Sequence, residues 1–128
     1  MNSLKEIWRP VVGYEDLYEV STRGRVRSKK TGKIKIASKG TGGYVKIMIS
    51  KNYSQRLLSV HRLVAEAFIP KQEGKEYVDH INTIRTDNRV ENLRWVTKSE
   101  NQSNPITIER NRIATKKRYV KETKVYHV

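Results

Sequence analysis

The sequence contains no cysteine and no long apolar run. Without cysteine there can be no disulfide framework and no thiolate zinc site, which excludes disulfide-stapled scaffolds and Cys-based zinc modules. The apolar runs are far shorter than the roughly 18 residues of a membrane-spanning helix. The opening MNSLKEIWRP carries Glu6 and lacks the apolar stretch of a secretory signal. We therefore expect a soluble protein that acts in the cytoplasm.

Acidic residues are also scarce. The 128 residues include 27 Lys and Arg against 13 Asp and Glu, a net charge of +14. Between Glu19 and Glu66 there are twelve basic residues and no acidic one, whereas soluble surfaces normally mix both signs. An anionic membrane would be a rival partner, but the chain lacks the basic amphipathic helix with a bulky apolar face that such binding uses. Nucleic acid is therefore the predicted partner.

The basic side chains predicted to contact DNA phosphates lie mostly in strand-like and glycine-rich segments. They are Arg23, Arg25, Arg27, Lys29, Lys30, Lys33, Lys35, Lys46 and Arg62. Glycines between residues 40 and 43 would let the backbone approach a groove closely. Tyr14, Tyr18 and Tyr44 are nearby aromatics, and such residues more often belong to the core or its rim than to a base-stacking platform.

The hydrophobic pattern predicts an α+β fold. Residues 7–28 are typical of short strands broken by turns, and the alternation in 33–38 and 43–50 indicates half-buried antiparallel strands. Residues 55–61 predict another strand, followed by a short helix over 62–68.

The stretch YVDH, at 77–80, predicts a strand, followed by a polar loop over 81–92 and a second strand over 93–97. The segment TKSE (97–100) then matches a capping box that opens a new helix. We divide the chain into a β-rich DNA-binding segment at 1–54, a core at 55–104, and a basic C-terminal helix or tail at 105–128.

This order of elements would bring Asp79, His80 and Asn101 together around one site. Carboxylate and amide oxygens suit a hard divalent cation such as Mg²⁺, and an imidazole can take a proton from water near neutral pH. Metal and base together are what phosphodiester hydrolysis requires. An isolated Asp-His dipeptide, however, is more often a strand end with no chemical role.

The spacing Asp-His-x11-Asn-x8-Asn, with DNRVENLRWVT inside it, resembles the HNH nuclease motif in its His-Asn-Asn form, which is built on the ββα-metal fold. Upstream, EIWRPVVGYEDLYEVSTRGRVRS is similar to the nuclease-associated modular DNA-binding motif of phage and intron-encoded homing endonucleases. SVHRLVAEAF is similar to the helix leading into their catalytic core. The resemblance implies an N-terminal antiparallel β segment followed by a ββα-metal core, acting on double-stranded DNA.

The resemblance implies a role for each matching residue. His80 would be the general base, and Asp79 and Asn101 would bind Mg²⁺ or another divalent cation such as Mn²⁺. Asn92 would pin the loop and orient His80. Arg94 would contact a phosphate, and Trp95 would belong to the core.

Other implications stay open at this stage. His61 matches a recurring histidine of the family, which could pack against the active-site strand or contact a phosphate. Asn82 and Thr83 stand where the family often has an acidic residue and a glycine. A catalytically inactive DNA-binding protein and a basic RNA-binding or structural protein are the alternative functions. One active site in a monomer would nick DNA, whereas a double-strand cut would need a dimer or two successive events.

Overall fold

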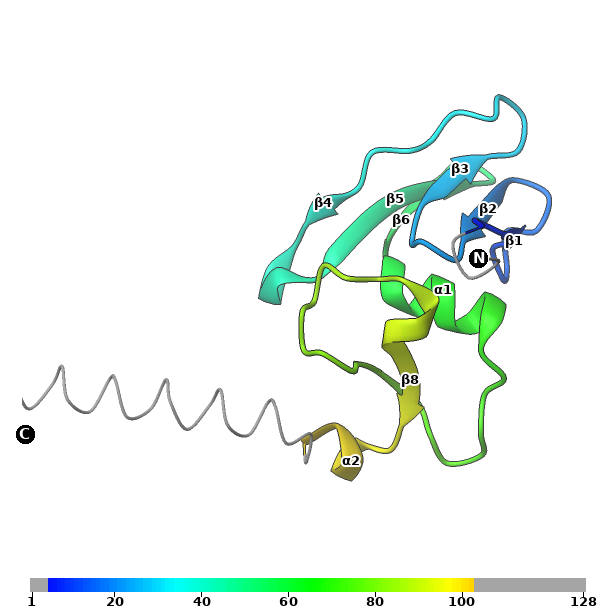
Figure 1. The fold of residues 1–128 in the computed structure, drawn as a ribbon. Helices are drawn as coiled ribbons and strands as arrows, with labels where there is room; N and C mark the ends of the chain where they lie inside the picture. The colour runs from blue at the N-terminus through cyan, green and yellow to red at the C-terminus, as the bar shows by residue number, and fades with distance from the viewer. Residues whose placement is uncertain (1–4, 103–128) are drawn as a thin grey trace, which may run out of the picture.

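Antiparallel strands make up the first half of the described chain, residues 5–102, in the computed structural model (Figure 1). The first sheet has the order β1-β2-β3, with β1 at Trp8–Pro10, β2 at Tyr18–Ser21 and β3 at Val26–Ser28. The second sheet has the order β4-β5-β6, with β4 at Ser38–Lys39, β5 at Val45–Lys51 and β6 at Ser54–Ser59. A short 3-10 turn, η2 at Thr41–Gly43, joins β4 to β5.

The second half begins with one central helix and continues with a two-stranded sheet. Its elements are α1 at Val60–Phe68, β7 at Tyr77–His80, the 3-10 turn η3 at Val90–Asn92, β8 at Leu93–Val96 and α2 at Lys98–Gln102. Strands β7 and β8 pair antiparallel. The α+β fold class is thereby confirmed, while the predicted basic segment at 105–128 lies outside the described residues. Within residues 5–102, no helix is long and apolar enough to cross a membrane.

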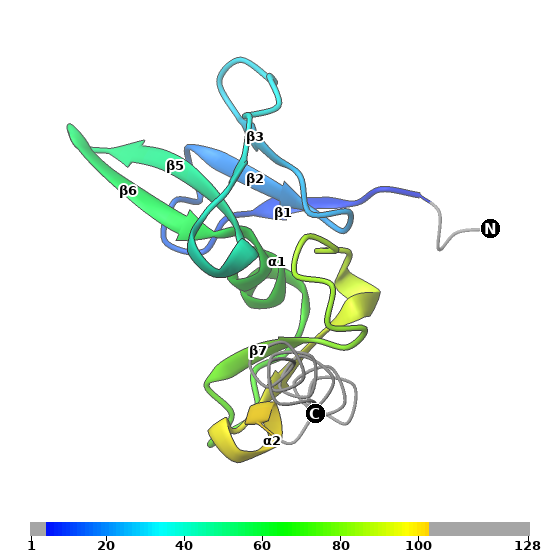
Figure 2. The same cartoon turned by 90° about the vertical axis from the view of Figure 1, so that its left-hand side faces the viewer.

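Helix α1 lies at the centre of the described part of the molecule. In the turned view it sits between the N-terminal strands and β7 (Figure 2). One hydrophobic core joins all three layers, with Val20 from β2, Ile49 from β5, Val64 from α1 and Leu93 from β8 among its members. The predicted boundary after residue 54 falls at the start of β6, and the core includes residues on both sides of it. The packing of α1 therefore sets how the N-terminal sheets meet β7.

The strand predicted over 33–38 forms only in part. Ile34 makes an isolated bridge with Arg27, and β4 is limited to two residues. Ile36 is 94% exposed, so the apolar side of this alternating segment does not pack against the core. In β5, by contrast, Ile47 and Ile49 are buried and Met48 between them is exposed, as alternation predicts.

Candidate active site

The predicted site lies at the end of β7, where Asp79 and His80 are 7% and 4% exposed. The register pairs Asp79 with Arg94 and His80 with Leu93. Because successive strand residues point to opposite faces, Asp79 shares a face with Arg94, and His80 shares the other with the core residue Leu93. The carboxylate and the imidazole therefore leave the hairpin on opposite sides.

The Asp79 carboxylate forms an ion pair with Arg94. Nε and Nη2 of Arg94 donate to Oδ2 of Asp79 at 3.2 and 3.0 Å. The carboxylate of this pair is buried, whereas the Arg94 side chain is 45% exposed and keeps contact with solvent. Arg94, which we predicted to contact a phosphate, is thus paired with Asp79, which we predicted to bind the metal.

Asn101 is brought to the same hairpin by α2, which packs against β7 and β8. The predicted capping box is present, because Thr97 N donates to Glu100 Oε1 at 2.9 Å and Glu100 N donates to Thr97 Oγ1 at 3.0 Å. Residues 5–102 contain no cluster of three acidic, histidine or cysteine side chains suited to a metal. A carboxylate and an amide oxygen nevertheless fit a hard cation that takes its other ligands from phosphate and water.

His80 is held by a residue that the motif analysis missed. Its Nε2 lies 2.7 Å from Oδ1 of Asn88, which is 5% exposed. An amide oxygen can only accept a hydrogen bond, so Nε2 of His80 donates and Nδ1 keeps the lone pair. Burial lowers the pKa of His80, opposed in part by the hydrogen bond to Asn88. The imidazole is therefore neutral near pH 7, with one nitrogen anchored and one free to accept a proton.

Asn88 in turn rests against the β2–β3 turn. Gly24 has φ +81°, and a Cβ there would lie 2.8 Å from Cβ of Asn88 and 2.9 Å from its carbonyl oxygen. Val90 N donates to Thr22 O at 2.9 Å beside this contact. Asn88 was not singled out from the sequence, and its contact with the β2–β3 turn forms only when the two halves of the chain pack together.

Asn92 is placed where it ties the loop after His80 to β8. Its Oδ1 accepts from Asn82 N at 3.0 Å, and its Nδ2 donates to Asn82 Oδ1 at 3.0 Å and to Asp87 O at 2.9 Å. Asn92 itself is 6% exposed. These contacts have the loop-pinning geometry that the resemblance implies, while the direct partner of His80 is Asn88.

Thr83 takes a backbone conformation that suits glycine. Its φ is +63°, a left-handed value that costs a β-branched residue about 1–2 kcal/mol. This is the position at which we noted the departure from the family's glycine. Thr83 N still donates to His80 O at 2.8 Å, so the turn forms despite the side chain.

Two of the predicted DNA contacts lie in ion pairs within the N-terminal sheet. Arg25 pairs with Glu6, and Arg27 pairs with Glu19 at 2.9 Å. Arg27 also lies over the Trp8 ring, with its guanidinium carbon 4.0 Å from the ring centroid. These arginines therefore help to hold β1 to β2 and β3, and part of their charge is already balanced.

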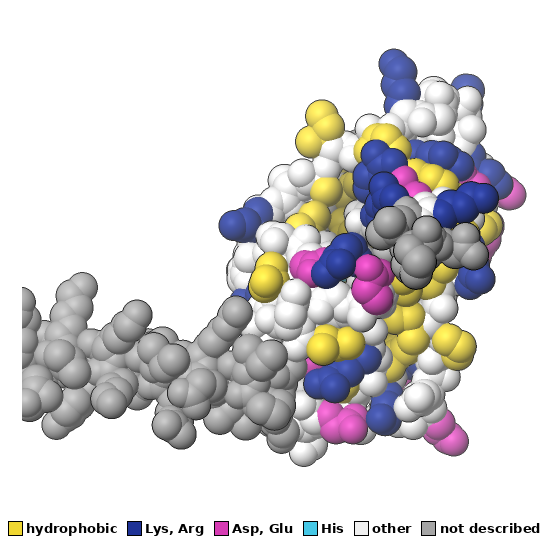
Figure 3. Space-filling view, in the orientation of Figure 1, with side chains coloured by type: hydrophobic (Ala, Val, Ile, Leu, Met, Phe, Trp, Pro, Cys, Tyr) yellow, Lys and Arg dark blue, Asp and Glu magenta, His cyan; other side chains and the backbone are white. Residues whose placement is uncertain are grey.

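The other residues predicted to contact DNA differ in their solvent exposure. Arg23, Lys29, Lys30 and Lys33 are exposed. The half-buried ones interact within the fold: Lys35 lies 5.6 Å over the Tyr18 ring, and Lys46 donates to Ser59 Oγ at 2.9 Å. On the face drawn in Figure 3, Lys and Arg side chains are densest in the upper part, where the N-terminal strands lie.

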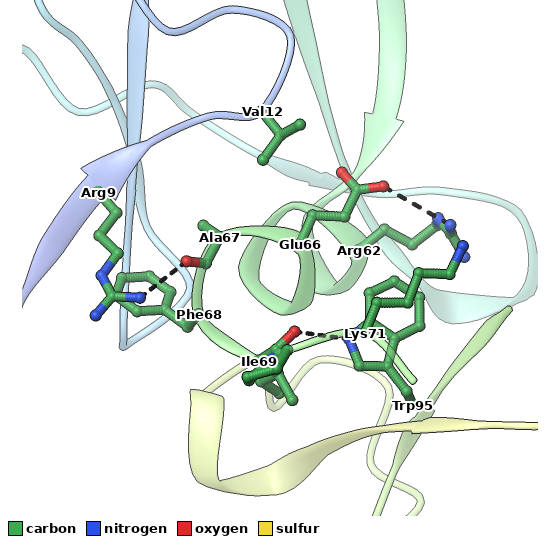
Figure 4. Close-up of a pocket in the computed structure, with 10 residues that line it drawn as sticks. Arg9, Val12, Arg62, Glu66, Ala67, Phe68, Ile69, Lys71 and Trp95 are labelled. Carbon is green, nitrogen blue, oxygen red and sulfur yellow. Dashed lines mark hydrogen bonds and ion pairs between the residues drawn. The ribbon is translucent and has the colours of Figure 1, made fainter. Parts of the chain in front are cut away.

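Arg62 lines a surface cavity of about 390 Å³, together with Glu66, Lys71 and Trp95 (Figure 4). Its guanidinium lies 5.5 Å over the Trp95 ring and donates to Glu76 O at 3.0 Å. Trp95 is buried, as expected, and its Nε1 donates to Ile69 O at 2.9 Å. The surroundings of Arg62 are thus those of a residue that braces α1 against β8.

Comparisons with known proteins match both halves of the chain. A model of the HNH endonuclease family matches residues 59–103, and a model of the NUMOD4 motif matches residues 6–50. The first match contains β7, β8 and α2, and the second contains β1–β3 and nearly all of β5. The first match also contains α1, and the second contains strands that pack against this helix.

The chain is similar to viral nucleases along most of its length. It is 38% identical over 125 residues to an uncharacterized HNH endonuclease of Acanthamoeba polyphaga mimivirus, covering 94% of this chain and 30% of that protein. It is 37% identical over 100 residues to the DNA endonuclease I-HmuI of Bacillus phage SP01, covering 78% of this chain and 58% of that protein. It thus spans less than two thirds of either relative.

A solved structure described as DNA binding and cleavage by the HNH homing endonuclease I-HmuI has the same fold. It superposes with a TM-score of 0.72 at 34% identity, covering 91% of this chain and 68% of that one. With the motif residues at the ends of β7, η3 and α2, these likenesses show that the chain belongs to the HNH endonuclease family and carries a NUMOD4 motif ahead of its nuclease segment.

Proposed function

We propose that the chain is a divalent-metal-dependent endonuclease that hydrolyses phosphodiester bonds of duplex DNA. The observation that carries the proposal is the state of His80: a buried, neutral imidazole whose Nε2 is anchored by Asn88. A neutral ring with one fixed nitrogen is what a general base needs, and its neighbour in the chain is a buried carboxylate. Family membership supports the same chemistry.

His80 would act on water through Nδ1. As Nδ1 takes the proton, the water oxygen forms a bond to phosphorus and the bond from phosphorus to the 3′ oxygen breaks. The products are a 5′-phosphate and a 3′-hydroxyl, the leaving oxygen receiving a proton from solvent. Anchoring of Nε2 keeps Nδ1 in one orientation, which lowers the entropy lost on reaching the transition state.

Asp79 and Asn101 would hold the cation, Mg²⁺ or another divalent ion such as Mn²⁺. When bound, the cation polarises the scissile phosphate and stabilises negative charge on the leaving oxygen. Arg94 would then give up at least part of its contact with Asp79, and its freed guanidinium could bind a phosphate of the substrate.

The N-terminal sheets would supply most of the affinity for DNA, since exposed lysines and arginines gather there. Because intracellular DNA is the proposed substrate, we expect the protein to act in the cytoplasm. A second candidate is a DNA-binding protein without turnover. The Arg94–Asp79 pair favours it, because the predicted metal ligand is already neutralised.

The proposal is tested by incubating supercoiled plasmid with Mg²⁺ and the wild-type chain, and in parallel with His80→Gln and Asp79→Asn. Glutamine can still donate to Asn88 but cannot take up a proton, so His80→Gln should nick at least about 10²-fold more slowly. Asp79→Asn should need more Mg²⁺ for activation, because the charged ligand is gone. Anisotropy with labelled duplex in EDTA should show unchanged binding for His80→Gln.

Two outcomes would count against these assignments. Nicking by His80→Gln within about threefold of wild type would mean that another residue is the base. A wild-type chain that binds duplex but cuts nothing in Mg²⁺ or Mn²⁺ would establish the second candidate.

A further inference from the structure

Two aromatic side chains from other elements pack beside the His80 ring. Tyr44 lies between η2 and β5, and His61 is the second residue of α1. The ring centroids of His61 and His80 are 4.9 Å apart, and Tyr44 stacks on His61 at 5.0 Å with an angle of 25° between the planes. Tyr44 is also 6.0 Å from His80. The three rings form one group that joins the N-terminal segment to β7.

His61 can contact His80 as a neutral ring but not as a cation. It is 8% exposed, and its Nδ1 is buried without a hydrogen-bond partner in the described part of the chain. Burial lowers the pKa of His61 to about 3, and His80, Arg62 and Lys46 act in the same direction. The ring is therefore neutral at any working pH and cannot bind a phosphate as a cation. A flat, neutral surface against His80 is what the contact provides.

The turn that carries Tyr44 is fastened to the loop that follows His80. The guanidinium of Arg85 lies 4.7 Å over the Tyr44 ring, and Arg85 also donates to the carbonyl oxygen of Gly42. Gly42 has φ +77°, and a Cβ there would lie 3.3 Å from the Tyr44 ring. Tyr44 is thus held by contacts with both Arg85 and His61.

We propose that Tyr44 and His61 are positioning residues for His80, so that the NUMOD4 segment supplies part of the nuclease site as well as affinity for DNA. The inference rests on the proposed role of His80 as the base. Asn88 fixes one nitrogen of the imidazole, but a single hydrogen bond leaves the ring free to swing about it. The His61 face blocks that motion, and Tyr44 keeps His61 in place.

The expected effect is on turnover. A base displaced by about 1 Å can cost about 10²-fold in rate, so removing the aromatic surface should lower kcat by about 10- to 100-fold. The KM for DNA should change by less than about threefold, because neither ring carries charge to the duplex. Ring-preserving variants should retain turnover, since no nitrogen or hydroxyl of this pair is required.

The experiment compares variants of the full chain that keep bulk but differ in the ring. Tyr44→Phe and His61→Phe preserve the ring, whereas Tyr44→Leu and His61→Leu remove it. Tyr53→Leu is the matched control, because Tyr53 is fully exposed at the β5–β6 turn. Each variant is measured for kcat and KM in plasmid nicking below its melting temperature. The imidazole Hε1 resonance of His80, which the neighbouring ring shifts, is recorded by NMR without metal or DNA.

The inference is supported if both leucine variants lose kcat, both phenylalanine variants keep it, and the His80 resonance moves only in the former. It is overturned if the leucine variants nick like wild type while His80→Gln is inactive, or if the resonance stays in place in all of them. A His80→Gln variant that nicks normally would refute the proposed role of His80, and the resonance would still report on the ring contact.

Discussion

Replacing Asn92 by alanine separates a supporting role from a chemical one. The substitution removes three hydrogen bonds in a partly buried setting, two to Asn82 and one to the carbonyl of Asp87. A hydrogen bond contributes a net 0.5–1.5 kcal/mol, and a buried group left without a partner costs more. Asn92→Ala should therefore lower the free energy of unfolding by about 2–4 kcal/mol. For a domain of this size, the melting temperature should fall by about 10–25 °C.

The assay pairs thermal melting followed by circular dichroism with plasmid nicking well below the transition. Nicking should fall about 10- to 100-fold, as expected when support around a reacting group is lost. Thr86→Ala, at an exposed position of the same loop, should stay within about 0.5 kcal/mol of wild type. The double variant with Asn82→Ala should show a coupling of about 0.5–3 kcal/mol, because one hydrogen bond joins the two side-chain amides, from Asn92 Nδ2 to Asn82 Oδ1.

Either of two results would refute this reasoning. If Asn92→Ala melts like wild type and yet has no nuclease activity, the side chain takes part in the reaction directly. If it melts early but nicks at the wild-type rate, the loop does not need to be pinned for His80 to work.

Four further predictions follow from single interactions. Gly24→Ala should destabilise the protein and slow nicking more than Gly13→Ala, since both have positive φ but only a Cβ at Gly24 meets Asn88; equal melting and nicking rates would remove Gly24 as a support. Thr83→Gly should stabilise the protein by about 1 kcal/mol by relieving its φ of +63°, and unchanged or lower stability in denaturant titration would show that the side chain compensates for the strain. Arg89 lowers the pKa of Asp87 to about 2. The stability that this carboxylate contributes is therefore present above about pH 4 and is lost as the pH falls toward 2. In Asp87→Asn the melting temperature should depend less on pH than in wild type, and only in that window. Replacing Lys29, Lys30 and Lys33 by alanine should reduce the salt slope of DNA binding, log K against log[salt], by about 0.9 for each phosphate that is no longer neutralised. Replacing the ion-paired Arg25 and Arg27 should reduce the slope less; a larger reduction than with the lysines would place the DNA on β3 itself.

Local patterns predicted the elements that carry the site with small errors. The strand over 77–80 has the predicted bounds, and the Thr97–Glu100 capping box forms as expected. These features depend on residues a few positions apart, so the sequence determines them before any tertiary contact exists. The same logic failed at 33–38, because alternation produces a strand only where one face can be buried and nothing covers Ile36.

The sequence by itself determined the β7–β8–α2 order, the spacing of Asp79, His80, Asn92 and Asn101, and the excess of positive charge. The contacts of Asn88 with His80 and of Arg94 with Asp79 stay within the β7–β8 hairpin. Tertiary structure alone decided what other elements place against it: the Tyr44–His61 surface beside the imidazole, and the β2–β3 turn against Asn88. The physical reason is that the sheets and β7 meet through α1, so these contacts join segments whose distance is set by core packing. A short-range pattern carries no information about that distance.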